Sequence, residues 1–176
     1  MKGIRLAGLA LLMVTVLVAG CSGGLVSEPS GGSTIPTEPV EGALAPNLML
    51  SDLNGDVISL SDLRGRPVLL NFWTTWCAFC RAERETLQQA HEEYGDKGLA
   101  VLAVAIGEDP TLLRNFVEEQ GLTYAILLDE DGRASRLYRV RGIPASFFID
   151  RQGVIQVQHV GALAEELLTE YVEKLQ

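Results

Sequence analysis

The apolar positions of this chain fall into two patterns that predict alternating strands and helices. Apolar, β-prone stretches occupy residues 67–73 and 125–128, and residues 99–106 form a continuous apolar run of the kind typical of a parallel strand buried on both faces. Between these stretches, apolar residues recur at helical spacing over residues 78–94. A second helix is predicted over residues 110–120, because Asp109 and Pro110 favour a helix start and Gly121 a helix end. Strands that alternate with helices in this way favour a layered α/β fold.

Further elements precede and follow this alternating core. Asn54-Gly55 lies between two short apolar stretches and predicts a β-hairpin. A short helix is predicted over residues 132–140, two strands joined by a tight turn over 145–149 and 154–160, and a last amphipathic helix over 164–175. The predicted fold class is therefore α/β, with three layers, a mixed central sheet, helices on both faces and an N-terminal β-hairpin extension.

The N-terminus has the pattern of an export signal. Lys2 and Arg5 precede an apolar run over residues 6–19, which is shorter than a membrane-spanning helix needs to be. Small residues then stand directly before Cys21, an arrangement that resembles the lipobox of bacterial lipoproteins. The resemblance implies that Cys21 becomes the lipidated first residue of a chain held at the extracytoplasmic face of a bacterial membrane, in the periplasm or at the cell surface. Ordinary signal cleavage beside an incidental cysteine is the alternative.

Composition divides the chain into three parts. Residues 1–20 are predicted to be the lipoprotein signal peptide, residues 21–45, rich in Gly, Ser and Pro, a lipidated flexible tether, and residues 46–176 a single folded domain. Cleavage of the signal removes two of the 14 basic residues and none of the 23 acids, so the formal net charge falls from −9 to −11. An acidic chain is a poor partner for nucleic acid, so we expect no nucleic-acid partner. The domain is expected to be a monomer.

Cys77 and Cys80 form a Cys-x-x-Cys motif at the junction between a buried strand and a helix. At a helix N-terminus, free backbone N–H groups and the helix dipole favour a thiolate, the form of cysteine that attacks disulfides. Cys80 lies about one turn further on, where it could resolve the mixed disulfide that Cys77 forms. If Cys21 carries lipid, these two cysteines remain as a self-contained redox pair.

Two other uses of this cysteine pair, an inert disulfide and half of a metal site, fit the sequence less well. An inert disulfide has no need of a helix N-terminus. A zinc site needs about four ligands, and the remaining soft ligands, His91 and His159, stand on unrelated predicted elements. We therefore predict no metal site and interpret both histidines as surface residues.

Five short motifs stand in order along residues 45–175. They are Ala45-Pro46, Leu60-Ser-Asp-Leu-Arg-Gly65, Leu70-Asn-Phe-Trp-Thr-Thr-Trp-Cys77, Gly107-Glu108 and Gly142-Ile-Pro-Ala-Ser-Phe-Phe-Ile-Asp150. Together with the element order, they resemble the thioredoxin-like fold and, more narrowly, the membrane-tethered TlpA/ResA-like thiol–disulfide oxidoreductases, which are related to the AhpC/TSA and Redoxin proteins. Phe79 and Glu85 depart from the family pattern, in which proline is usual at both places.

The resemblance implies a substrate surface beside the cysteines. Pro144 is expected to follow a cis peptide bond, so that the backbone of Ile143 turns outward and offers its N–H and C=O groups to an extended substrate. Trp76 is expected to flank the reactive sulfur and to form part of this surface. Arg81, four residues after Cys77 on the same helical face, is either a charge that favours the thiolate or an ordinary solvated residue.

Glu108 is the candidate proton donor and acceptor. In ResA-like proteins a glutamate after the corresponding strand lies near the active site, which implies for Glu108 a buried carboxylate of raised pKa that exchanges protons with Cys80. Asn71 occupies the place where thioredoxins carry a buried aspartate, and because asparagine does not titrate, another base is needed. The alternative for Glu108 is an acid stabilised at the start of the following helix.

The resemblance implies a membrane-anchored oxidoreductase that reduces disulfides in client proteins through a cycle between the Cys77/Cys80 dithiol and its disulfide, with no other cofactor. Apocytochrome c is the family's best-known type of client, and a membrane-bound thiol protein would supply the electrons. Three alternatives stay open: an oxidase that donates disulfides, a non-catalytic binding module and a peroxiredoxin-like peroxidase. Thr74 fits a peroxidase in standing three residues before Cys77, whereas Leu70 stands where peroxiredoxins have proline.

Overall fold

The computed structural model describes residues 35–175 of the chain. The predicted signal peptide, the predicted lipidation site Cys21 and the first part of the predicted tether lie outside the described residues. Within residues 35–175, none of the helices has the length and the apolar character that crossing a membrane requires.

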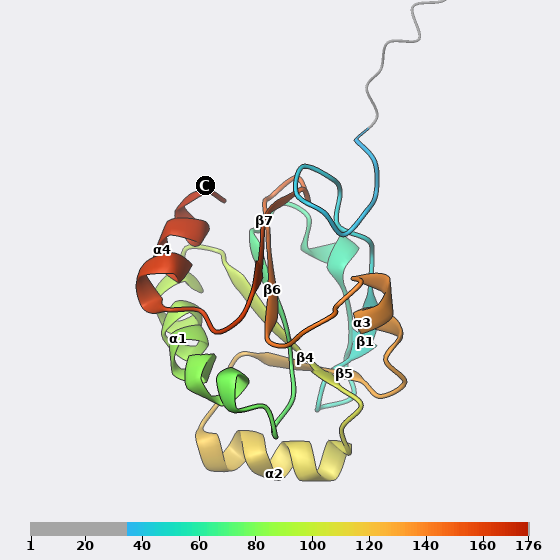
Figure 1. The fold of residues 1–176 in the computed structure, drawn as a ribbon, viewed down its shortest axis with the longest axis vertical. Coiled ribbons are helices and arrows are strands. Elements are labelled where there is room, and N and C mark those ends of the chain that lie inside the picture. Colours follow the sequence, from blue (N-terminus) through green and yellow to red (C-terminus); the bar gives the residue numbers. More distant parts are fainter. Residues whose placement is uncertain (1–34, 176) are drawn as a thin grey trace, which may run out of the picture. The chain divides into compact units, whose positions relative to one another are not determined.

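A five-stranded mixed sheet forms the centre of the fold (Figure 1). Its strands are β3 (Val68–Trp73), β4 (Ala100–Ile106), β5 (Ala125–Asp129), β6 (Ala145–Ile149) and β7 (Ile155–Val160). Their spatial order is β5-β4-β3-β6-β7; β3, β4 and β5 are parallel, β6 is antiparallel to β3, and β7 is antiparallel to β6. Every residue of β3 is buried, as expected for a central strand covered on both faces. The predicted mixed sheet is therefore confirmed.

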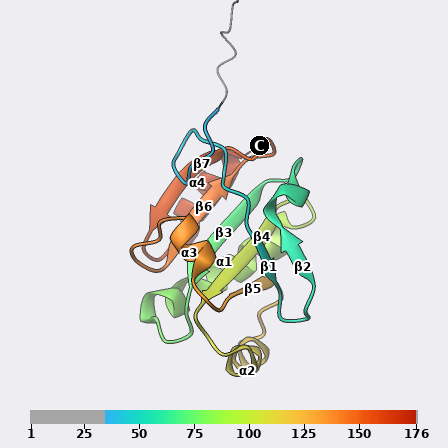
Figure 2. The same cartoon turned by 90° about the vertical axis from the view of Figure 1, so that its right-hand side faces the viewer.

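Helices cover both faces of this sheet (Figures 1 and 2). One face carries α1 (Ala78–Tyr94), α2 (Pro110–Gln120) and α4 (Glu165–Glu173), and the other carries the hairpin of β1 (Met49–Ser51) and β2 (Val57–Ser59), the 3-10 helix η1 (Leu60–Leu63) and α3 (Arg133–Leu137). On the first face Leu87, Leu113 and Leu168 pack into one core. On the second face the ring of Tyr138 packs against Phe72 with centroids 5.3 Å apart. The three layers and the N-terminal hairpin predicted from the apolar pattern are confirmed.

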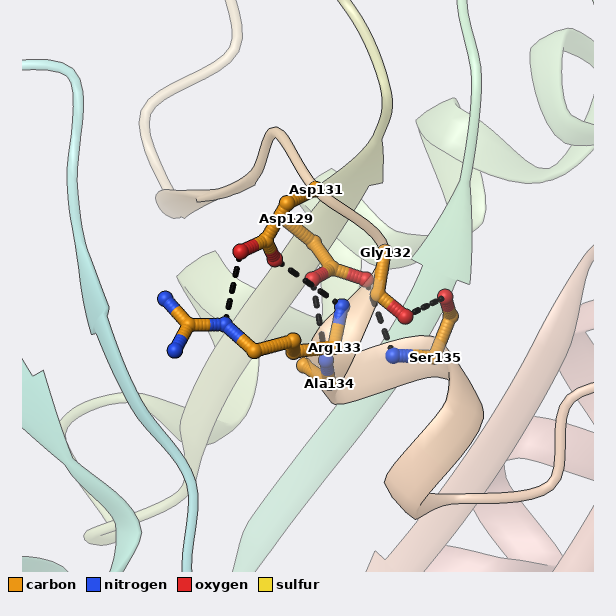
Figure 3. Close-up of polar contacts among 6 residues, drawn as sticks. All are labelled: Asp129, Asp131, Gly132, Arg133, Ala134 and Ser135. Carbon is orange, nitrogen blue, oxygen red and sulfur yellow. Dashed lines mark hydrogen bonds and ion pairs between the residues drawn. The ribbon is translucent and has the colours of Figure 1, made fainter.

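Asp129, the last residue of β5, fixes the start of α3 (Figure 3). Its buried carboxylate accepts hydrogen bonds from the backbone N–H groups of Ala134 at 2.9 Å and Ser135 at 2.8 Å. The first N–H groups of a helix lack acceptors within the helix, and the Asp129 carboxylate is the acceptor for two of these N–H groups. α3 ends at Leu137, earlier than predicted, because Arg139 adopts a positive φ of 52° that a right-handed helix excludes. The chain then leads directly toward β6.

The folded domain includes residues 36–45, which the sequence places in the tether before the predicted domain start at Pro46. This docking segment (residues 36–45) pairs with the edge strand β7, where Ile155 donates a backbone hydrogen bond to Ala43 at 2.9 Å and accepts one from Gly42 at 2.8 Å. The predicted boundary is therefore too late. The segment has no apolar period, and it is held by backbone bonds to a strand edge, which composition does not reveal.

Candidate active site

Cys77 and Cys80 lie where the turn after β3 enters α1, as the sequence predicts. Cys77 is the N-cap residue of α1, and its sulfur accepts a hydrogen bond from the backbone N–H of Cys80 at 3.2 Å. Both are free thiols with 7% and 3% of their surfaces exposed. The sulfur of Cys77 thus lies at the N-terminal end of a 17-residue helix, where the helix dipole favours negative charge.

The loop before β6 faces the sulfur of Cys77. The Ile143–Pro144 peptide bond is cis, which confirms the expectation from the resemblance. The thiol of Cys77 points its proton toward the backbone C=O of Ile143, with sulfur and oxygen 3.8 Å apart. Trp76 and Phe79, on either side of Cys77 in the sequence, expose 71% and 68% of their surfaces. A substrate that reaches Cys77 therefore meets a loop backbone and exposed aromatic side chains.

Cys80 is the more deeply placed cysteine. Burial raises the pKa of Cys80 to about 12, and the hydrogen bond to Cys77, the charge of Cys77 and the charge of Glu83 add to the rise. A backbone hydrogen bond with Thr74 opposes it. Because only the thiolate attacks a disulfide, Cys80 can react at neutral pH only when a neighbouring base removes its proton.

Glu83, one turn after Cys80 on α1, is a buried carboxyl group that the sequence did not single out. It is 1% exposed, and it accepts hydrogen bonds from Asn71 Nδ2 and from the backbone N–H of Leu163, each at 2.8 Å. Burial raises the pKa of Glu83 to about 7, although both hydrogen bonds act in the opposite direction. A carboxyl group with this pKa gains and loses its proton near neutral pH. The proton chemistry expected of Glu108 is therefore available at Glu83.

A signal for Glu83 is present in the pattern of α1. The buried positions of this helix are Cys80, Glu83, Leu87 and Ala90, which lie along one face. Glutamate is almost never fully buried unless it is paired or hydrogen-bonded. A glutamate in register with the apolar face of a core helix therefore points either to a polar network or to a functional carboxyl group.

Glu108 holds the turn that precedes Cys77. Its carboxylate, in the loop after β4, accepts hydrogen bonds from the backbone N–H of Thr75 at 2.9 and 3.1 Å and from the Thr75 hydroxyl at 2.5 Å. Glu108 is half-buried, whereas the resemblance implied a buried carboxylate. The guanidinium of Arg81 donates to the C=O of the same Thr75 at 3.3 Å. Glu108 and Arg81 thus fix one turn residue from two sides.

The two histidines are not the surface residues that the sequence suggested. His91 and His159 are half-buried, because each ring packs against a tyrosine, Tyr124 at a centroid distance of 6.4 Å and Tyr171 at 5.9 Å. In the part of the chain that the structure describes, no three His, Cys, Asp or Glu side chains are grouped so that they could hold a metal ion.

A dithiol at the start of a helix, faced by a cis-proline loop on a mixed sheet, is the arrangement of thioredoxin-fold thiol–disulfide oxidoreductases, and the protein is an enzyme of this class. Over residues 42–158 the chain matches the AhpC/TSA family. The chain belongs to this family. Enzymes of this class exchange disulfides with protein thiols.

Several named relatives are similar over most of the described chain. The thiol-disulfide oxidoreductase ResA of Bacillus thuringiensis (strain Al Hakam) is 35% identical over 134 residues, which cover 76% of this chain and 78% of the relative. ResA of Bacillus subtilis (strain 168) is 34% identical over 132 residues, which cover 75% and 74%.

Solved structures of similar proteins share the fold. The thiol:disulfide interchange protein DsbE from Chlorobium tepidum gives a TM-score of 0.71 at 34% identity, over 75% of this chain and 94% of that chain. The exposed lipoprotein thioredoxin Etrx1 from Streptococcus pneumoniae strain TIGR4 gives a TM-score of 0.64 at 28% identity, over 74% and 100%. The thioredoxin-like fold predicted from the motifs is confirmed.

Proposed function

We propose that the protein is a lipid-anchored, extracytoplasmic oxidoreductase that reduces disulfides in client proteins through a Cys77/Cys80 cycle. One observation carries the proposal: the two cysteines lie in different surroundings. Cys77 lies at the helix start and faces the loop at Ile143, whereas Cys80 is buried and has a pKa raised to about 12. Glu83, with a pKa of about 7, follows one turn later. The disulfide that joins the two cysteines is the only redox group in this proposal.

In the first step, the Cys77 thiolate attacks one sulfur of a client disulfide. A new S–S bond joins Cys77 to the client, and the second client sulfur leaves as a thiolate. The backbone of Ile143 beside Pro144 would hold the client segment as an added strand. The exposed side chain of Trp76 would contact the same segment.

In the second step, Cys80 releases the client. The Glu83 carboxylate accepts the proton of Cys80, directly or through one water, and the resulting thiolate attacks the sulfur of Cys77. An S–S bond forms between Cys77 and Cys80, and the bond to the client breaks. The client gains two electrons and the cysteine pair loses them. A membrane-bound thiol protein would then reduce the pair by the reverse exchange.

The proposed location rests on the lipobox-like segment before Cys21. The description of the similar Streptococcus pneumoniae protein as an exposed lipoprotein supports it. Outside the cytoplasm an idle dithiol tends to become a disulfide, which is why a dedicated electron donor belongs to the proposal. The resemblance to ResA-like proteins makes apocytochrome c the first client to test, with the enzyme acting as a monomer.

The reduction potential of the cysteine pair tests the direction of electron flow. The mature chain is equilibrated with thiol/disulfide buffers, and the oxidised fraction is measured by tryptophan fluorescence and by alkylation of free thiols. A potential near that of thioredoxin, about −270 mV, is expected for a reductant. A potential near about −120 mV would instead make the protein a donor of disulfides. Oxidation by peroxide that is faster than oxidation by disulfides would favour the peroxidase alternative.

Glu108→Gln separates two roles of this carboxylate. If Glu108 positions Thr75, the variant slows the attack of Cys77 by about tenfold, because hydrogen bonds to a charged acceptor are about twice as strong as neutral ones. We expect this slower attack by Cys77, and single-turnover experiments that resolve attack from client release would measure it. Glu119→Gln, on the exposed face of α2, is the matched control. A slower release with an altered pH profile would instead support proton transfer by Glu108.

A further inference from the structure

A groove of about 430 Å³ opens beside the cis-proline loop. Its walls include Val40 of the docking segment, residues 139–142, Ala145, and Val160 at the end of β7. Because Gly142 and Ala145 flank the Ile143–Pro144 bond, the groove adjoins the loop that faces the reactive sulfur, on the side of the sheet that carries α3. Val40 and Val160 are 40% and 62% exposed, so the groove presents apolar surface to solvent.

One wall of the groove is an open strand edge. The N–H of Gly161 donates to the C=O of Pro144 at 2.9 Å, so the backbone of Gly161 faces β6. Backbone groups of an antiparallel strand alternate between its two sides, and Gln158 and Val160 therefore turn theirs away from β6. The outward N–H of Gln158 donates a hydrogen bond to the Glu41 carboxylate at 2.9 Å. The outward backbone groups of Val160 have no hydrogen-bond partner among residues 35–175, so an extended peptide can pair with this edge.

The rim of the groove carries two arginines and two glutamates, Glu38 beside Arg139 and Glu41 beside Gln158. Arg139 and Arg141 are both exposed and both line the groove. Arg139 lies 3.6 Å from Glu38, whereas Arg141 forms no ion pair with any residue from 35 to 175. The guanidinium group matches the geometry of a carboxylate, to which it can donate two hydrogen bonds.

We infer that this groove binds the client segment next to the reacting cysteine and favours segments in which an apolar residue stands beside acidic ones. The apolar side chain would contact Val40 and Val160, and an acidic side chain would pair with Arg141, since Arg139 already lies beside Glu38. Glu38 offsets the charge of Arg139, so the preference comes from Arg141. Acidic residues further away than about 8 Å are largely screened at physiological ionic strength. The inference rests on the proposed function, because it needs a client joined to Cys77.

The first step alone provides the test. In a Cys80→Ser background the Cys77 thiolate attacks a peptide whose cysteine carries a 2-thiopyridyl group. The peptide becomes disulfide-bonded to Cys77, and 2-thiopyridone leaves with the electron pair of the broken bond and takes up a proton. The absorbance of 2-thiopyridone gives the rate. Two peptides are compared at physiological ionic strength, identical except for aspartates or lysines that flank one valine beside the cysteine.

The aspartate peptide is expected to react about tenfold faster than the lysine peptide, and Arg141→Gln is expected to reduce this preference about threefold, as for one exposed ion pair. Lys97→Gln removes the same charge beyond the other end of α1 and is expected to leave the preference unchanged. Val40→Asp places a carboxylate inside the groove and is expected to reverse the preference.

Equal rates for the two peptides would overturn the inference, as would a preference that survives both Arg141→Gln and Val40→Asp. Neutral 2,2′-dithiodipyridine, which is too small to span the groove, reports the chemistry of Cys77 by itself. If it reacts normally while the peptides show no preference, only the groove inference fails. If neither it nor the peptides react with Cys77, the proposed function fails.

Discussion

Cys77→Ser is expected to lower disulfide reduction to the uncatalysed rate, whereas Cys80→Ser is expected to keep the first step and accumulate the client as a mixed disulfide. The difference arises because a serine hydroxyl provides no thiolate to attack the client, while loss of Cys80 removes only the group that resolves the adduct. Reduction of a protein disulfide by excess dithiol gives the rate, and mass spectrometry of the non-reduced protein detects the adduct.

Both cysteine variants should remain folded. Each substitution changes one atom at a nearly buried site, and the expected loss of stability is about 1 kcal/mol, which thermal unfolding measures. An adduct that accumulates in Cys77→Ser but not in Cys80→Ser would reverse the roles of the two cysteines. Full activity of Cys77→Ser would exclude the proposed cycle.

Glu83→Gln is expected to slow the release of the client by about a hundredfold or more, the usual contribution of a general base. The reason is that burial raises the pKa of Cys80 to about 12, so its proton must be transferred before it can attack. The rate of attack by Cys77 should stay unchanged, and the pH profile of release should lose its inflection near pH 7, the pKa of Glu83. Single-turnover kinetics between pH 5 and 9 would measure both steps.

The same substitution should change how stability depends on pH. Burial raises the pKa of Glu83 from its ordinary 4.5 to about 7, so between these values the folded protein keeps a proton that the unfolded chain has lost. Stability therefore falls as the pH rises from 4.5 to 7, by about 3 kcal/mol in total. Glu83→Gln should remove this decline and be more stable than the wild type above pH 7, as denaturant unfolding at several pH values would show.

The environment of Glu83 accommodates a glutamine. The Asn71 amide donates to Glu83 at 2.8 Å, while its own Oδ1 has no hydrogen-bond partner among the described residues. If the Asn71 amide turns over, this oxygen can accept from a glutamine NH₂ group. The Asn71 NH₂ group then leaves Glu83 and Ser146, so the exchange costs about one buried hydrogen bond. Glu85→Gln, on the exposed part of the same helix, is the matched control and should alter neither kinetics nor stability. Unchanged release in Glu83→Gln would make Glu108 the next candidate base.

The cysteines and the cis-proline loop could be predicted because their signals are local. A buried apolar run before Cys77 and a helical period after it are enough to place the dithiol at a helix start. The short motif around Pro144 and its distance from the cysteines made the thioredoxin-like fold recognisable. Each motif is recognisable within a few residues of sequence, and the thioredoxin-like fold sets the number of residues between the two motifs.

The pattern of α1 places Glu83 on the buried face, but the partners of its carboxyl group come from distant parts of the chain and could not be predicted. Asn71 comes from β3 and Leu163 from the loop before α4, and together they enclose the carboxyl group only after the fold has closed. Glu108, by contrast, stands beside a recognisable motif, which drew attention to it. Its hydrogen bonds to Thr75 depend on a turn geometry that residue types do not specify.

The docking segment also has a practical consequence for the behaviour of the protein in solution. Its bonds to Ile155 cover part of the outer edge of β7, and an uncovered strand edge is a template for pairing with a second molecule. A fragment that begins at the predicted domain start, Pro46, would lack this cover and would be prone to self-association. Soluble fragments for measurement should therefore begin no later than Ile35, so that aggregation is not mistaken for a property of the native chain.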